Sequence, residues 1–192
     1  MKVVATVLLI GALVGTAIVN NLDKSVRDAL FSQGLKAAIE AYKKAHPPQL
    51  PPNAPEKVEE ANKTYVPLIL KYINISREQA KLKPVILDAK LCEVARYRAQ
   101  KLVELGDLTH DIPNIGKASA SLRQFGLAVP KFVGENIGIY KAEKNAAYIH
   151  QDFMYSQGHR AIILEPRATR VGIGIALDEV GDKWVCEIFA SP

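Results

Sequence analysis

Cysteine is scarce in this chain, which has Cys92 and Cys186 and no others among its 192 residues. Neither residue belongs to a C-x-x-C pair or stands at a metal-binding spacing from a histidine. This excludes a cysteine-based metal or redox motif. A disulfide between the two is permissible if the chain is exported, and a pair of buried, unlinked thiols fits the sequence equally well.

Clustered charge is also missing. The 25 Lys and Arg residues are mixed with 20 Asp and Glu residues, which gives a net charge of +5 and an isoelectric point of about 9.1. Because this mild excess forms no basic stripe with interleaved aromatic residues, we expect no nucleic-acid partner. It favours a weak attraction to anionic lipid or cell wall instead. The sequence also has no internal repeat and no G-x-S-x-G motif of a serine hydrolase.

The N-terminus carries one long apolar run. After Lys2 no charge occurs until Asp23, and Val3–Val19 exceeds the roughly 7–15 apolar residues of a usual signal peptide. It falls slightly short of the roughly 20 residues of a spanning helix, although about 17 can suffice. We predict that residues 1–22 are an uncleaved membrane anchor, with a cleaved signal peptide as the alternative. In both cases the rest of the chain is exported.

Two further segments separate this run from the remainder. Residues 23–46 have apolar side chains at roughly helical spacing, which predicts a stalk helix. Residues 47–55 contain five prolines in nine positions. Proline fixes φ and removes a hydrogen-bond donor, so this segment is expected to be an extended linker. The domain boundary is therefore placed here, with a compact domain over residues 56–192.

That domain reads as a mixture of helices and strands. The expected elements are a helix over 56–81 that breaks near Pro67, a helix after Asp88 that Gly106 ends, a short helix over 117–126, a strand over 133–140, a helix over 142–156, and two strands within 170–191 joined by an acidic turn. Because they do not alternate as β-α-β units, the fold class is α+β. Gly172 and Gly174 leave one strand face flat enough for another element to approach closely.

Two of the four histidines and one glutamate are candidates for chemistry, whereas His46 lies at the edge of the linker and is expected to be solvated. His110 and His159 lie at the ends of expected elements beside loops, whereas His150 lies mid-helix and is expected at the surface. Glu135 follows a glycine at the start of a strand. Two imidazoles and a carboxylate from three elements would suit a divalent metal such as zinc or an acid–base pair.

Ser156 allows two interpretations. It lies three residues before His159, and on one helix face the two would be neighbours, as a nucleophile and its base would need to be. The alternative, which we favour, is that Ser156 caps a helix N-terminus. Cys92 is a poor nucleophile candidate, because it lies near the apolar stripe of its helix.

These pieces together resemble the CAP superfamily of cysteine-rich secretory, antigen 5 and pathogenesis-related 1 proteins, and more closely its bacterial SCP-like extracellular branch. The stretch "YINISREQAKLKPVIL" with Asn74 and Arg77 is similar to the family's opening segment. "LTH" ends in the first family histidine, His110, and "VGENIG" carries the family acid, Glu135. "FMYSQGHRAIIL" carries the second histidine, His159, and "VGIGIA" and "KWVCEIFAS" are similar to the two closing strands.

The resemblance implies an α-β-α sandwich with a central antiparallel sheet. It also implies a cleft formed by His110, Glu135, Ser156 and His159. Some family members bind a divalent metal, often zinc, through the two histidines, which here are His110 and His159. A carboxylate such as Glu135 can then orient an imidazole or hold a bound water.

This copy departs from the family pattern at several positions. Ser156 stands where many eukaryotic members have a second glutamate, and Phe153 replaces the usual tryptophan. Ile162 stands where an asparagine is typical. Glu187 stands where glutamine is common in the last strand. Strand alternation places it with Val185, and the sequence leaves open whether that face borders the cleft.

Three functions are compatible with this sequence. The favoured one is an extracellular binding module, secreted or held at the membrane by its N-terminal segment, for a lipid-like or cell-envelope ligand or a protein partner. The second is a metal-dependent hydrolase with Glu135 as its general base. In the third, His110, Glu135 and His159 form a hydrogen-bonded polar cluster that fixes helix–sheet packing. Whether the protein is an enzyme stays open at this point.

Overall fold

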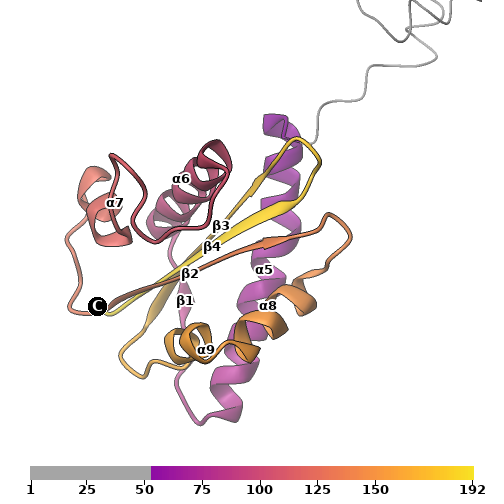
Figure 1. Ribbon diagram of the computed structural model, residues 1–192. Coiled ribbons are helices and arrows are strands. Elements are labelled where there is room, and N and C mark those ends of the chain that lie inside the picture. The colour runs from indigo at the N-terminus through magenta and orange to yellow at the C-terminus, as the bar shows by residue number, and fades with distance from the viewer. Residues whose placement is uncertain (1–52) are drawn as a thin grey trace, which may run out of the picture. The chain divides into compact units, whose positions relative to one another are not determined.

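The computed structural model describes residues 53–192, which form a four-stranded sheet with helices on both faces (Figure 1). In chain order the elements are α5 (Pro55–Gln79), β1 (Ile86–Leu87), α6 (Ala89–Leu105), α7 (Ala118–Gln124), β2 (Val133–Tyr140), α8 (Ala146–Tyr155), α9 (Gln157–Ile163), β3 (Arg170–Leu177) and β4 (Lys183–Ala190). The predictions for residues 1–22, 23–46 and most of 47–55 lie outside the described residues. Within the described part, no helix combines the length and apolarity needed to cross a membrane.

The sheet has the strand order β1-β3-β4-β2. β4 pairs antiparallel with β3 on one side and with β2 on the other, while the two-residue β1 pairs parallel with β3. The predicted α+β class and α-β-α sandwich are confirmed, with this short parallel edge strand as the departure from a fully antiparallel sheet. The turn between β3 and β4 contains Gly181 at φ 88°, a backbone conformation that suits glycine.

Each face of the sheet buries an apolar core of its own. Helices α6 and α7 cover one face, and α5, α8 and α9 cover the other (Figure 1). The glycines of β3 let α6 approach closely, as predicted. A Cβ atom at Gly172 would lie 2.1 Å from the carbonyl carbon of Leu91, and one at Gly174 would lie 2.1 Å from the backbone nitrogen of Arg96.

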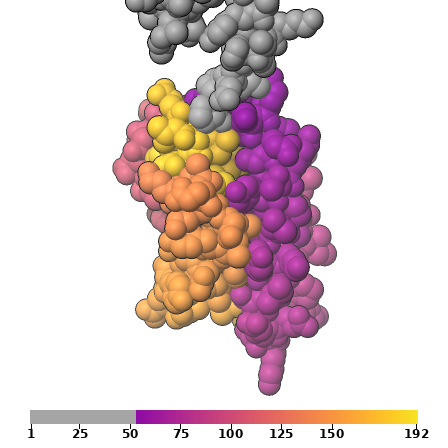
Figure 2. Space-filling view, turned by 90° about the vertical axis from the view of Figure 1, so that its right-hand side faces the viewer, coloured from indigo at the N-terminus to yellow at the C-terminus, as the bar shows by residue number. Residues whose placement is uncertain are grey.

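Helix α5 continues through Pro67, so the predicted break is wrong. A proline inside a helix removes one backbone hydrogen bond and typically costs about 3 kcal/mol. Here Val66, Ile69 and Ile73 bury the helix against the sheet on both sides of the exposed Pro67. This packing outweighs the local cost. In Figure 2, α5 (indigo to magenta) forms a continuous ridge next to the orange segment that contains α8.

His150 is buried, contrary to the surface position expected for it. It is 7% exposed, its Nε2 atom lies 2.8 Å from the Ser76 hydroxyl, and its ring stacks on Tyr72 at 6.2 Å between centroids. Burial lowers the pKa of His150 to about 4, so the imidazole is neutral at neutral pH. Its spacing of one and four residues from the buried Ile149 and Ala146 places it on the stripe of α8 that packs against α5.

The predicted caps of α6 are confirmed and fix where the chain leaves this helix for the site. The Asp88 carboxylate accepts hydrogen bonds from the backbone N–H groups of Lys90 at 2.9 Å and Leu91 at 3.1 Å. Gly106 ends the helix at φ 70°, in the left-handed region. The chain then runs through His110 toward α7, alongside β2.

Candidate functional site

Glu135 is the centre of a polar cluster on the α6 face of the sheet. Its side chain is 5% exposed. One carboxylate oxygen, Oε1, accepts a hydrogen bond from Arg98 Nε and one from the Cys186 thiol at 3.4 Å. The other oxygen, Oε2, accepts from Arg98 Nη2 at 3.2 Å and lies 2.8 Å from His110 Nδ1. Both oxygens of Glu135 are therefore engaged.

Arg98 holds the surroundings of this carboxylate in place. The guanidinium is fully buried in α6 and donates to the carbonyls of Gly116 and His110 and to the Ser121 hydroxyl, each at 2.9 Å. The same side chain thus fixes Glu135 and the backbone of the histidine that Glu135 contacts. The position of the His110 loop follows from these bonds.

Arg98 was not predicted from the sequence, although a signal was present. Residue 98 lies three positions after Ala95 and four before Leu102, which places it on the buried stripe of α6. A cation on such a stripe needs a buried acceptor, because an unpaired charge is costly to bury. The arginine therefore indicated a carboxylate, without indicating which one.

The pKa of Glu135 lies below its ordinary value of 4.5. Burial alone would raise this pKa, but hydrogen bonds from His110 and Arg98 and the charge of Arg98 together outweigh the burial. Glu135 is consequently ionised at neutral pH, with its charge matched by a buried guanidinium. A general base needs an oxygen within reach of the proton that it removes, and neither oxygen of Glu135 is unengaged.

His110 is oriented by Glu135 while remaining accessible. Its side chain is 56% exposed, in contrast to the buried carboxylate beside it. Because Nδ1 faces Glu135, the ring presents Nε2 on its other side. A carboxylate bonded to one ring nitrogen fixes the tautomer and the ring direction of a histidine, as it does for histidines that bind metals.

His159 lies at the first turn of α9, and Ser156 is the N-cap of that helix. The Ser156 hydroxyl accepts from the backbone N–H of His159 at 3.5 Å, so the capping interpretation is confirmed. The half-buried imidazole of His159 packs edge-on against Phe153, with 5.0 Å between ring centroids. Burial and the nearby charge of His110 lower the pKa of His159, which favours the neutral ring.

A second polar pair connects His159 to the sheet, and its member Asn136 was not predicted from the sequence as a site residue. The Asn136 amide nitrogen donates to the backbone carbonyl of His159 at 3.3 Å and to the Glu187 carboxylate at 3.1 Å. Neighbouring strand residues face opposite sides, so Asn136 and Glu187 lie on the α9 side while Glu135 lies on the α6 side. This settles the facing of Glu187, which alternation alone left open.

The arrangement of these residues along the chain matches a known family. A sequence model of CAP, the cysteine-rich secretory protein family, matches residues 70–188, which is more than half of the chain. This chain belongs to the CAP family. The CAP match includes every residue of the site, so the resemblance that began with isolated motifs is confirmed.

Several bacterial proteins are similar to this chain in sequence or in fold. The uncharacterized YkwD protein of Bacillus subtilis (strain 168) is 29% identical over 169 residues, which are 83% of this chain and 64% of YkwD. An extracellular SCP-domain protein from Bacillus anthracis (Ames) superposes with a TM-score of 0.63 at 22% identity, over 72% of this chain and 44% of that one. An outer surface protein from Borrelia burgdorferi gives a TM-score of 0.59 at 14% identity, over 66% of this chain and 91% of that one.

The lengths of these proteins differ. The present chain spans less than two thirds of YkwD and less than half of the Bacillus anthracis protein. At 22% and 14% identity the two solved structures show a shared fold. The chemistry of the CAP site must therefore be argued from the residues of this chain.

Two imidazoles are available as ligands for a metal ion at this site. Within residues 53–192, no group of three or more His, Cys, Asp or Glu side chains is placed to hold a metal ion. Glu135 is bonded to Arg98 and orients His110, so the candidate ligands are His110 and His159. Structural zinc sites have four protein ligands and catalytic ones usually three. The described residues therefore offer at most two ligands, which is fewer than either arrangement requires.

The two cysteines are both free and buried. Cys186 lies against Glu135, and the Cys92 sulfur accepts from the backbone N–H of Ile173 at 3.4 Å. Burial raises the pKa of both thiols. Of the two possibilities left open by the sequence, the structure has the unlinked thiols.

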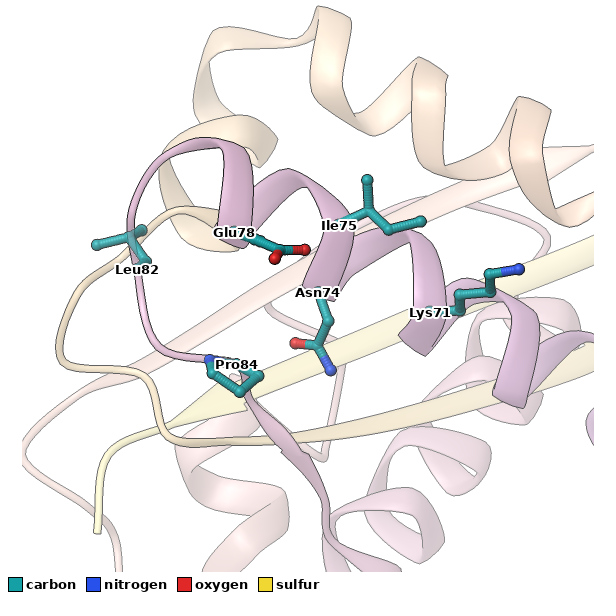
Figure 3. A pocket seen from close by; sticks show the side chains of 6 residues that line it. All are labelled: Lys71, Asn74, Ile75, Glu78, Leu82 and Pro84. Carbon is teal, nitrogen blue, oxygen red and sulfur yellow. The ribbon is translucent and has the colours of Figure 1, made fainter.

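Two surface hollows of the CAP domain lie beside α5. One hollow of about 400 Å³ (Figure 3) is lined by Lys71, Asn74, Ile75, Glu78, Leu82 and Pro84. Another, of about 290 Å³, includes Val66, Leu87 and Cys92 in its lining. Neither of these two hollows borders the His110 and His159 site.

Proposed function

We propose that this chain is an exported CAP protein that acts as a binding module in the cell envelope. Its ligand would be an envelope component, a lipid-like molecule or a protein partner, recognised beside His110 and His159. The two relatives described as extracellular or outer surface proteins and the apolar segment Val3–Val19 support export. Attachment through residues 1–22 would hold the domain at the membrane.

The observation that carries this proposal is the engagement of both oxygens of Glu135. Arg98 and His110 occupy the carboxylate that a hydrolase would need as its base. The same bonds fix the direction of an exposed imidazole. Rigidly held polar groups recognise a polar ligand at a lower entropic cost than mobile ones. Among the ligand classes, this favours a polar envelope component.

The experiment uses the full chain in nanodiscs and purified bacterial cell-wall sacculi as the probe. Sedimentation should show binding of the wild-type protein, weakened by about tenfold when His110→Ala and His159→Ala are combined, since two recognition groups are lost. Circular dichroism must show that the double variant is folded. Wild-type protein that stays in the supernatant, or a folded double variant that binds equally well, contradicts the proposed site.

A metal-dependent hydrolase is the alternative. It is favoured by the bond between Glu135 and His110, because a carboxylate orients metal-binding histidines in this way. His110 and His159 would hold the metal, and a bound divalent ion would supply acidification of a water molecule. Calorimetric titration of the full chain with Zn²⁺, together with release of soluble fragments from the same sacculi, tests this alternative. Stoichiometric zinc binding with fragment release would replace the binding-module proposal.

A further inference from the structure

The polar pair behind His159 includes a glutamate that the site described above does not use. Glu187 is fully buried in β4, directly opposite Asn136 of β2 in the strand register. Its other register neighbour, in β3, is Ile173. A carboxyl group at this depth needs a partner, because burying an unpaired charge or hydrogen-bonding group is costly.

Asn136 connects this glutamate to α9. Its amide nitrogen has two hydrogens, and the two bonds, to Glu187 Oε2 and to the His159 carbonyl, use both. Asn136 is itself fully buried. The chain of contacts thus runs from β4 through β2 to the backbone of the histidine at the site.

Two neighbouring acceptors are left without a donor. Glu187 Oε1 and Asn136 Oδ1 are both buried and have no hydrogen-bond partner among the described residues. A proton on Glu187 would turn one acceptor of this pair into a donor. Burial raises the pKa of Glu187 to about 8, and the Asn136 bond offsets only part of this effect.

We propose that Glu187 is a positioning residue for His159 and acts through Asn136. Glu187 holds the Asn136 amide in the direction from which it binds the His159 carbonyl. Ile162 of the same helix packs beside Gly134 of β2. The inference rests on the proposed role of His159 at the site.

Several other titratable groups lie on the same side of the sheet as Glu187. They are Tyr65, Tyr72 and Arg77 of α5, Tyr140 of β2, Tyr148, His150 and Asp152 of α8, His159 of α9, and Lys183 of β4. Tyr140 donates to Asp152 at 3.1 Å, and Arg77 donates to backbone carbonyls that include those of Ile163 and Ala168. Within the described residues, none of these groups forms a hydrogen bond to Glu187. The experiment therefore follows the raised pKa of Glu187, about 8, through the signals of His159.

The test follows NMR signals of the His159 ring and the α9 amides, using the full chain in detergent micelles between pH 6 and 10. Wild-type His159 signals should show an inflection near pH 8. Glu187→Gln keeps an uncharged side chain with a donor and an acceptor, so it should abolish the inflection and preserve amide protection. Glu187→Ala should shift the His159 signals and speed amide exchange at His159 by about tenfold.

Asn62→Ala is the matched control. Asn62 is also a buried amide, but it bonds to α5 and to Ile175 of β3 instead of α9. Its loss should lower stability and leave the His159 signals in place. Unchanged His159 signals in folded Glu187→Ala, or an inflection that persists in Glu187→Gln, overturns the proposal. If Glu187→Ala does not fold, Asn136→Ala and Glu187→Gln decide it by the same criteria.

The readout needs no ligand, so it separates this inference from the proposed function. His159 can be positioned by Glu187 in a protein that fails to bind sacculi. Conversely, the protein could bind sacculi while its His159 signals stay unchanged in the Glu187 variants. That result would support the binding module and contradict the positioning role.

Discussion

The two faces of the sheet each bury one glutamate, and the pair differ in what surrounds the carboxyl group. Glu135 faces α6 and meets the guanidinium of Arg98, whereas Glu187 faces α9 and meets the neutral amide of Asn136. The pKa of Glu135 is lowered, and that of Glu187 is raised to about 8. At neutral pH the first carries a charge and the second a proton.

This difference shows that the partner, more than the depth, decides the state of a buried carboxyl group. Both glutamates are buried, so desolvation opposes the charge at both positions. At Glu135 a cation and hydrogen bonds to the charged form overcome it. At Glu187 a single amide does not. Glu135 therefore fits the role of a fixed anion that orients His110. Glu187 fits the role of a neutral group that positions His159 through Asn136.

The largest expected effect on stability comes from removing Arg98, the cation that pairs with Glu135. Arg98→Met should lower the free energy of unfolding by about 3–5 kcal/mol, because it leaves the Glu135 charge buried without its partner. Urea denaturation measures the loss. Combining Arg98→Met with Glu135→Gln removes the stranded charge and should recover part of it. A double variant as unstable as Arg98→Met alone would show that the ion pair is not the reason.

An effect of comparable size, opposite in sign for the two glutamates, is expected from pH. The raised pKa of Glu187 means that its contribution to stability is present below about 4.5 and is lost as pH rises to about 8. The slope is about 1.4 kcal/mol per pH unit. The lowered pKa of Glu135 makes its contribution present above 4.5 and lost as pH falls through the folded value.

Denaturation of wild type and Glu187→Gln between pH 5 and 8 measures the first of these slopes. Relative to wild type, Glu187→Gln should become progressively more stable across this range. A constant difference between the two proteins would mean that Glu187 is already ionised in the folded state.

The smallest effect is expected at the exposed partner of Glu135. His110→Ala removes one bond to the carboxylate but leaves Arg98 in place, and 56% of the His110 side chain is in solvent. Exposed charged contacts contribute about 0–1 kcal/mol, so stability measured by urea denaturation should change by no more than that. A loss comparable to that of Arg98→Met would favour the interpretation of the cluster as a structural element over a recognition site.

Much of the fold could be predicted from local signals. Strand β2 was predicted at Val133–Tyr140, and the caps Asp88 and Gly106 bracketed α6, because alternation and capping depend on nearby residues. The passage of α5 through Pro67 could not be predicted in this way. Its cause is burial against a sheet formed by residues more than a hundred positions later.

The site was predicted in part for the same reason. Family motifs indicated His110, Glu135 and His159, and the structure joins His110 to Glu135 directly while placing His159 on α9 with its backbone bonded to Asn136. Ser156 followed its local capping pattern. Arg98 and Asn136 were missed as site components, because their roles depend on contacts across 37 and 23 positions of the chain.

By itself, the sequence determined the order and type of the elements other than β1 and α9, the flat glycine face of β3 and the membership of the CAP family. These follow from periodicity, caps and motifs, which are properties of short segments. Only the tertiary structure decided which carboxyl group meets a cation, that the two thiols stay apart, and that His150 is buried. Charge state and burial depend on neighbours brought together from distant parts of the chain, and no local pattern encodes which neighbours those are.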